Sequence, residues 1–577
     1  FTLNPADLWS CRADTRLYKF LGIICSISTV TQYTQAARYY CTVTTCDGYT
    51  GQHFIRMHTP GASEFQTIRN DFVCIFCGST LVEDASCRLL SDKIIVQMLS
   101  YDALNSNGCR HQAISVFLRG DLTSDIMIGK SYRVIGIPTY QHNESKISVA
   151  IEANNIYMDS KKLEQICNQG NCSITMPSSV LTLYDDRKSS SWSFVASLAY
   201  IFGGDITPPG TYFRLKLGML LSLVETPKNN KQKSKVSRCL HVLAIGCDTL
   251  VIHRLLTFGA SFCKRNIQHS ASTSLFTSVT KDNHGTGACT IDGGSLLLAK
   301  NGICSLGDLS HYRKDTREKL LHVMENSSIS VDIPRKFSDA APQKQMVLPI
   351  LCNIWAYTYP STGNHKGIKG IFQNQDLGNI PNTFADTFGM VYVCDNPDTT
   401  RDDTAQQTLI NQVLTAAVLD DKQQHTVQSI ITYEDFKKFL DYVSEMHVEF
   451  TSSAEYLIKG YFVGSRRVRS SGVHATPFPQ SAMKAIACMA SAHAKLSLRR
   501  EVVEEDAVLA IMLYEESVTA RYGYSVLSVQ PTPHFQQDNL PLYVGKQNDL
   551  KMQQFQVQLT RFCLSHASEL SSRFTEE

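Results

Sequence analysis

Three kinds of hydrophobic pattern follow one another along this chain, and their order limits its fold more than any single motif does. Up to about residue 156, short β-type runs such as 20–30 are separated by turn residues, which predicts a small barrel or ribbon. From 178 to about 417, strand-like runs such as 241–245 alternate with helical stretches such as 315–324, which is typical of a parallel α/β sheet. Apolar residues then recur at helical spacing, as in 480–498, so the C-terminal part is predicted to be helical.

Charge and cysteine content narrow the class of protein. The 577 residues include 55 Lys plus Arg and 53 Asp plus Glu, a net charge of +2, so any surface that binds nucleic acid must be a local patch. The 19 cysteines are spread along a long chain, so we expect most of them to be reduced thiols in an intracellular protein. The most apolar window, 240–262, contains Asp248, His253 and Arg254, and therefore no membrane span is expected.

Two cysteine pairs in the β-rich part have the spacing of metal ligands. Cys74 and Cys77 are separated by two residues and followed by Gly78, which allows both thiolates to face one tetrahedral ion. Cys41 and Cys46, separated by four residues, form the second pair, and together the pairs predict a zinc ribbon with a structural zinc ion. The alternative is that all are free cysteines in a chain with many others nearby, such as Cys87.

Several segments resemble the minichromosome maintenance (MCM) helicases. Residues 115–125 (SVFLRGDLTSD) and 128–137 (IGKSYRVIGI) are similar to the second half of the MCM oligonucleotide-binding (OB) fold. Residues 292–304 (DGGSLLLAKNGIC) and 322–330 (HVMENSSIS) resemble the runs on either side of the MCM Walker B motif, and 503–507 (VEEDA) resembles part of the lid. The likeness keeps the same order over about 18–522, which is more specific than any one motif.

The resemblance implies a multidomain architecture. An N-terminal OB-type β-barrel with a zinc ribbon would be followed by a degenerate AAA+ α/β ATPase-like core and a C-terminal helical lid. The expected ranges are 1–17 for a remnant of the N-terminal helical subdomain, 18–158 for the OB-fold with its ribbon at about 41–77, 159–177 for a linker, 178–417 for the core, 418–523 for the lid and 524–577 for a C-terminal tail.

The phosphate-binding loop of the family is not preserved. The aligned residues, 246–253 (GCDTLVIH), retain only its first glycine, Gly246. Ile252 stands where the lysine that contacts the β- and γ-phosphates is required, and His253 where a hydroxyl would hold magnesium. Asp248 would repel phosphate, and the chain contains no other GxxxxGK[ST] motif.

The remaining ATPase positions are replaced as well. By the same resemblance, Gly307 stands at the metal-binding aspartate of the Walker B motif and Asp308 at the glutamate that activates water. Tyr359 replaces the sensor asparagine, Thr387 the arginine finger and Ser481 the lid arginine. Phosphoryl transfer depends on positioning and charge neutralisation, so the resemblance implies a pseudo-ATPase that binds neither ATP nor magnesium.

The family's DNA-contacting lysine aligns near Ile333, and other basic clusters lie at 264–265, 335–336 and 466–469. Each cluster is either a DNA contact or a solvated face. The near-neutral net charge favours the solvated face, because phosphate contacts dominate DNA affinity.

With every ATPase signature eroded, the chain is most similar to a divergent germline branch of the family. That resemblance implies a nuclear, non-catalytic factor in meiotic recombination and double-strand break repair, with effects on homologue pairing and crossover formation. It would act as a scaffold or subunit with other MCM-like or meiotic recombination proteins, on single- or double-stranded DNA and not at a membrane. The alternatives are an ATP-dependent DNA helicase subunit and a stand-alone DNA-binding module.

Overall fold

The chain forms two compact units, each built from segments that are distant in sequence. The computed structural model describes residues 16–62, 64–100, 112–143, 146–158, 176–208, 210–227, 239–281, 289–332, 345–360, 377, 380–394, 410–411, 414, 431–471, 478–529 and 544–566. The first unit comprises 1–171, 271–300 and 329–349, and the second comprises 172–270, 301–328 and 350–577. Most of the expected linker, 159–175, and the basic cluster at 335–336 lie outside the described residues.

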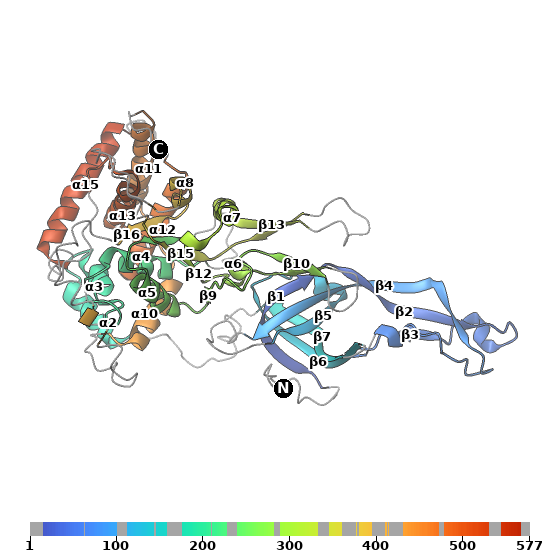
Figure 1. Ribbon diagram of the computed structural model, residues 1–577. Helices are drawn as coiled ribbons and strands as arrows, with labels where there is room; N and C mark the ends of the chain where they lie inside the picture. Colours follow the sequence, from blue (N-terminus) through green and yellow to red (C-terminus); the bar gives the residue numbers. More distant parts are fainter. Residues whose placement is uncertain are drawn as a thin grey trace. The chain divides into compact units, whose positions relative to one another are not determined.

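Antiparallel pairing dominates the first unit. Its main strands are β1 (Tyr18–Ser28), β2 (Thr31–Cys41), β3 (Ile55–Met57), β4 (Leu81–Ser100), β5 (Ile114–Arg119), β6 (Ser131–Asn143) and β7 (Lys146–Met158). Neighbouring strands pair in the order β1-β6-β7-β5-β4, and β1 also pairs with β4, so these strands close into a ring (Figure 1). Within this ring β5 and β7 are parallel and the other pairs are antiparallel.

The long strand β4 belongs to two substructures. Its last part, around Ile94–Val96, is buried in the ring, whereas residues 85–90 are exposed. The exposed part pairs with β2, whose other edge carries β3, and together they project from the ring as a ribbon (Figure 1). The expected cysteine knuckles lie at the far end of this ribbon.

Two segments from the middle of the chain complete the first unit. Strands β10 (Ser278–Lys281) and β11 (Cys289–Asp292) extend the sheet, because β11 pairs with β1 in the register Ile27↔Ile291. Helix α6 (Ser295–Leu298) follows, and β13 (Ser328–Asp332) and β14 (Gln345–Pro349) form a separate hairpin.

The second unit contains a parallel sheet between helices. Its described strands are β8 (Val242–Ile245), β9 (Asn266–Gln268), β12 (Ile303–Asp308), β15 (Asn353–Thr358) and β16 (Met390–Val393), in the order β16-β8-β15-β12-β9. Strand β8 is buried along its whole length, as expected for a parallel strand covered on both faces. The helices of this part are α2 (Ser178–Arg187), α3 (Ser193–Ile201), α4 (Phe213–Val224), α5 (Thr249–Ser261), α7 (Lys314–Asn326) and α8 (Asn382–Ala385).

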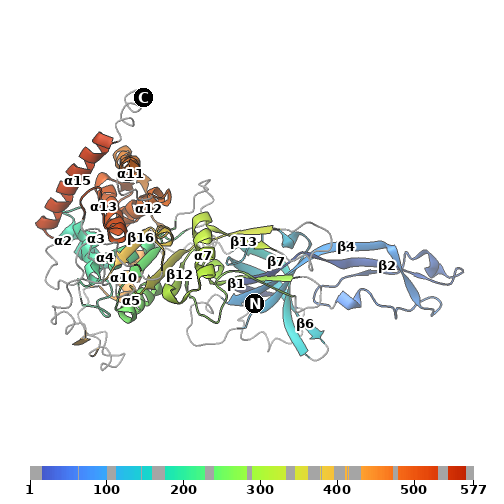
Figure 2. The same ribbon diagram turned by 45° about the horizontal axis from the view of Figure 1, so that its top comes forward.

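The C-terminal part of this unit is helical. It contains α10 (Tyr433–Glu445), α11 (Ser452–Ser471), α12 (Ser481–Leu496), α13 (Glu504–Tyr522) and α15 (Lys546–His566). Helix α10 begins after Thr432, whose hydroxyl accepts a hydrogen bond from the Asp435 N–H, as in a standard N-cap. Helix α15 lies within the segment expected to be a tail, and it packs against α11 and α13 (Figure 2). None of the described helices is long and apolar enough to cross a membrane.

Candidate functional site

The four predicted metal ligands come together at the end of the ribbon. Cys41 is the last residue of β2, and Cys46 precedes a 3₁₀ turn that begins at Asp47. Cys74 and Cys77 lie in the loop that leads into β4. The ligand atoms of the four cysteines all lie within 4.8 Å of one another.

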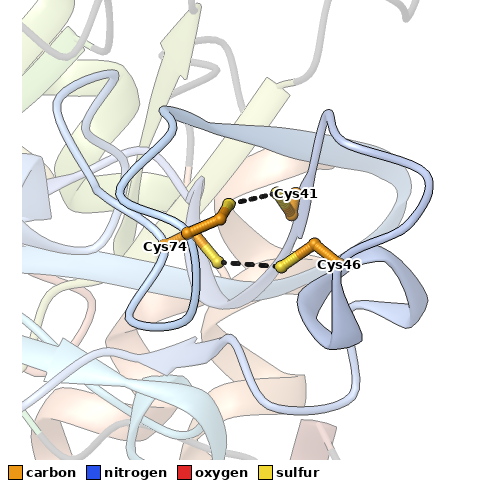
Figure 3. Close-up of side chains that lie close together, drawn as sticks. Cys41, Cys46 and Cys74 are labelled. Atoms are coloured by element: carbon orange, nitrogen blue, oxygen red, sulfur yellow. Dashed lines mark hydrogen bonds between the residues drawn. The ribbon is translucent and has the colours of Figure 1, made fainter.

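The spacing of the sulfurs fits one tetrahedral ion. The distance between the Sγ atoms is 3.3 Å for Cys41 and Cys77 and 3.7 Å for Cys46 and Cys74. Figure 3 shows Cys41, Cys46 and Cys74 lying close together. Sulfurs at the corners of a tetrahedral site with Zn–S bonds of about 2.3 Å lie about 3.8 Å apart. The donor set therefore suits zinc, and four protein sulfurs would leave no open position for a substrate.

Backbone N–H groups around the cluster donate hydrogen bonds to two of its sulfurs. The N–H groups of Val43 and Gly48 point to the sulfurs of Cys41 and Cys46, at 3.4 and 3.5 Å. Gly78 adopts a left-handed φ of +74°, and its N–H donates to the Cys74 carbonyl at 2.9 Å, which closes the second knuckle. The two loops thus direct donors toward the sulfurs as well as the sulfurs toward one another.

A serine that sequence reasoning missed adjoins the cluster. The Ser79 hydroxyl lies 2.8 Å from the Cys77 sulfur and 3.1 Å from that of Cys41. Hydrogen bonds from Ser79, together with those from Cys41 and Cys46, lower the pKa of the Cys77 thiol to about 6. Cysteine spacing gave no indication of this hydroxyl, because its role depends on the turn at Gly78.

The second candidate site lies where three parallel strands end. Strands β8, β15 and β12 are neighbours, so the residues after their carboxyl ends share one edge of the sheet. Gly246 follows β8, and its N–H donates to the carbonyl of Thr358, the last residue of β15. Asp308 ends β12 and Tyr359 follows β15. The structure therefore brings Gly246, Asp308 and Tyr359 to one edge of the sheet, where ligands of open α/β sheets commonly bind.

Most of the expected phosphate-binding loop is helical. Helix α5 already begins at Thr249, three residues after Gly246, and the Ile252 N–H bonds to the Asp248 carbonyl at 3.1 Å. The Ile252 side chain is completely buried in the apolar core of this unit. A P-loop needs free backbone N–H groups and an exposed lysine, whereas here the N–H donates within the helix and the side chain is part of the core.

The side chains around this helix start make contacts of another kind. The Tyr212 hydroxyl lies 3.4 Å from a carboxylate oxygen of Asp248, a contact that sequence reasoning missed. The His253 ring packs edge-on against the Tyr357 ring, with centroids 5.8 Å apart. No cation is contributed by 246–253, so the only formal charge in this segment is that of Asp248.

The residues expected at the Walker B motif, Gly307 and Asp308, have structural roles within their own segment. Gly307 has a φ of +76° at a register irregularity of β12, so its role is to bend the strand. The Asp308 carboxylate accepts a hydrogen bond from the Ser310 N–H at 2.8 Å and caps a 3₁₀ turn, with His311 3.5 Å away. Burial raises the pKa of the nearby Tyr357, and the negative charge of Asp308 adds to the effect.

Thr387, at the arginine-finger position, donates its hydroxyl hydrogen to the Phe384 carbonyl at 2.7 Å. The preceding Asp386 forms an ion pair with Arg521, and the Tyr522 hydroxyl donates to it at 2.7 Å. Burial raises the pKa of Asp386, although the Arg521 charge opposes the increase. Asp386 thereby links the loop after α8 to helix α13.

Each described basic cluster contains both buried and exposed side chains. Arg469 is buried and its guanidinium bonds to Glu515 at 2.9 Å, while Arg466 and Arg467 are exposed. In the other cluster, Arg265 is buried and Lys264 pairs with Asp441 at 2.8 Å. Neither 264–265 nor 466–469 is therefore a continuous basic surface.

Comparisons with known proteins agree with this architecture. The family model described as the MCM P-loop domain matches residues 208–413, and the MCM AAA-lid domain matches residues 434–518. Minichromosome maintenance domain-containing protein 2 of Homo sapiens is 37% identical over 565 residues, which cover 96% of this chain and 80% of that protein. The Mus musculus protein of the same name is 35% identical over 575 residues, covering 97% of this chain and 82% of its own length.

A more distant relative is the minichromosome maintenance protein MCM of Saccharolobus solfataricus, at 21% identity over 434 residues, covering 70% of this chain and 57% of that protein. Residues 208–413 thus match an MCM AAA+ domain and residues 434–518 its lid, and a β-rich region that carries the cysteine cluster precedes them in the chain. The chain belongs to the MCM family, and it is similar to minichromosome maintenance domain-containing protein 2 over nearly its whole length.

Proposed function

We propose that this chain is a pseudo-ATPase that serves as a non-catalytic scaffold or subunit of an MCM-like complex on DNA. The observation that carries the proposal is Ile252. Its side chain is completely buried where the phosphate-contacting lysine should be exposed, and its N–H is bonded within helix α5. Gly307 supplies no metal ligand, and the charge of Asp248 repels phosphate.

The first unit fits an OB-type barrel with a structural zinc ion. The closed ring with one parallel pair, β5 with β7, supports the OB assignment, since such folds are five-stranded Greek-key barrels. The sulfur spacing supports zinc over four independent thiols. Cys41, Cys46, Cys74 and Cys77 would hold the ion, which would stabilise the ribbon.

The proposed biological role rests on similarity. A nuclear factor in meiotic recombination and double-strand break repair, acting in homologue pairing and crossover formation, is supported by 35–37% identity to minichromosome maintenance domain-containing protein 2 over nearly the whole chain. Its partners would be other MCM-like or recombination proteins, together with single- or double-stranded DNA.

A nucleotide titration tests the pseudo-ATPase proposal. Purified full-length chain should show no saturable binding of a fluorescent ATP analogue with magnesium, and no phosphate release with single-stranded or duplex DNA present. An authentic MCM helicase serves as the positive control under the same conditions. Binding in the micromolar range together with turnover would instead support the helicase alternative.

A further inference from the structure

Helix α15 has two apolar faces, and of these the described residues cover one. Met552, Phe555, Leu559 and Cys563 are buried and belong to the core of the second unit. They face α11 and α13, against which α15 packs at the edge of this unit (Figures 1 and 2). This first face explains why the helix is held in place.

The second face is exposed and follows a seven-residue period. Leu550, Val557 and Leu564 have exposed fractions of 58%, 51% and 56%. Seven residues are nearly two turns, so these side chains form one stripe with steps of about 10.5 Å along the helix. Helices that pack side by side repeat apolar residues at two positions per heptad, and this stripe supplies one of the two.

An open, shallow depression of about 530 Å³ lies on α15 beside the first two residues of the stripe, Leu550 and Val557. Its lining consists of Leu550, Gln553, Gln554, Val557, Gln558 and Arg561. Glutamine amides and one guanidinium thus border the apolar stripe, giving the polar rim and apolar centre typical of an interaction surface.

The exposed charged side chains of α15 are all positive. Lys546, Lys551 and Arg561 are exposed on this helix. Its one acid, Asp549, accepts a hydrogen bond from the Ser190 hydroxyl at 2.6 Å. On the flank, Glu504 accepts one from Gln556 at 3.1 Å. Asp549 and Glu504 are thus engaged locally, and the exposed charged side chains of α15 are positive.

We propose that the face of α15 formed by Leu550, Val557 and Leu564 binds an acidic amphipathic helix of a partner protein. The heptad stripe takes the apolar side of that helix, and the flanking cations attract its carboxylates. A second copy of this chain fits less well, because a symmetric pair brings two sets of cations to one interface.

A designed peptide pair provides the probe. One peptide has about three heptads with leucine at a and d and glutamate at e and g, and its match has lysine at e and g. Fluorescence anisotropy with the full chain should show micromolar binding of the glutamate peptide, at least about tenfold tighter than the lysine peptide. Equal binding of the two peptides, or no binding of either, would overturn the proposal.

Substitutions locate the binding surface. Val557→Glu keeps a good helix former at an exposed position and should weaken the glutamate peptide at least about tenfold. Arg561→Glu should shift the preference toward the lysine peptide. The control Leu181→Glu, at an exposed leucine of α2, should leave both affinities unchanged. Equal affinities for the wild type and Val557→Glu would contradict the proposed site.

Two other occupants give distinct results, and each would overturn the proposal. Sedimentation velocity that detects a dimer of the wild type but a monomer of Val557→Glu would identify a second copy. Peptide binding that appears only after Glu569→Gln, Glu576→Gln and Glu577→Gln would identify the chain's own C-terminal segment. Neither test depends on nucleotide, so failure here leaves the pseudo-ATPase proposal intact.

Discussion

At the scale of single residues, Ile252 links the fold to the proposed loss of nucleotide binding. A lysine at this position must reach phosphate, whereas the isoleucine is fully buried against its neighbours in the core. Burying an ammonium group without a partner costs several kcal/mol or lowers its pKa. The substitution is thus built into the packing of α5 and is not a surface change.

We therefore expect Ile252→Lys to fail in two respects. It should produce no ATP turnover, since Gly307 and Thr387 still lack the metal ligand and the trans arginine. It should also lower the free energy of unfolding by about 3 kcal/mol or more. Urea unfolding and a phosphate-release assay measure the two effects. Ile252→Val, the control, should cost only about 1 kcal/mol. Turnover by the lysine variant would refute the pseudo-ATPase proposal.

A second residue-scale prediction concerns the metal ligands. Cys74→Ser should remove zinc from the purified protein, because one ligand of a closed four-sulfur site is lost. Elemental analysis should give about one zinc per wild-type chain and far less for the variant. Cys87→Ser is the matched control, since Cys87 is an exposed cysteine outside the cluster. Zinc-free wild type, or equal zinc in Cys74→Ser, would contradict the assignment.

At the scale of elements, a charged network fixes the segment after β3 to the ring strands. Glu152 of β7 lies 3.0 Å from the His58 ring nitrogen and 3.0 Å from the Arg119 guanidinium of β5. Its other oxygen accepts a hydrogen bond from the Gly61 N–H at 2.6 Å. Burial alone would raise the pKa of Glu152, but these hydrogen bonds and the Arg119 charge outweigh it and lower the pKa. The ionised carboxylate therefore stabilises the folded state.

The pH dependence of this contribution follows from the direction of the shift. A carboxyl with a lowered folded pKa contributes stability above its ordinary pKa of about 4.5, which is lost as pH falls through the folded value. Glu152→Gln should therefore cost about 3 kcal/mol at pH 7 and much less at about pH 3. Urea unfolding at both pH values tests this. The control Glu83→Gln, which removes the more exposed pair with Arg88, should have a much smaller effect. An equal cost at both pH values would exclude the ionic explanation.

Elements that form from local pattern could be predicted from the sequence. The apolar run 241–245 gave β8, observed at Val242–Ile245, because a buried parallel strand is a continuous hydrophobic segment. The helical pattern at 315–324 likewise gave α7, observed at Lys314–Asn326. The cysteine spacing gave the cluster, because two short loops can each direct two sulfurs to one point.

Features that depend on distant partners could not be predicted. Pairing of β11 with β1 joins residues that are more than two hundred positions apart, which no local pattern encodes. Helix α5 starts early, at Thr249, and buries Ile252 in the core, and an alignment by motif does not show either feature. Helix α15 carries apolar residues on two faces, so it lacks the single stripe by which sequence reasoning recognises an amphipathic helix.

At the scale of the whole molecule, the two units should differ in how their stability depends on a ligand. Zinc should stabilise the first unit, whereas nucleotide should not stabilise the second. Anything that binds only the folded state stabilises it by mass action. Zinc held by four thiolates contributes its binding free energy to folding, and protons compete for the thiolates at low pH. A nucleotide with a Kd of about 10 μM would add about 2.7 kcal/mol at 1 mM.

Thermal unfolding of the full chain should therefore respond to a chelator and not to ATP with magnesium. A strong zinc chelator should lower the temperature at which the ribbon unfolds. Hydrogen exchange measures this in peptides that cover residues 41–81, and exchange in β8 and α5 should stay unchanged. Millimolar ATP with magnesium should leave both regions unchanged, because Ile252 and Gly307 provide neither charge nor metal ligand. Acidification should release zinc, with the same loss of protection at 41–81, because each thiolate must bind a proton to leave the metal. Protection of β8 and α5 by ATP would show that the second unit still binds nucleotide, and would require a phosphate site other than the one at Gly246.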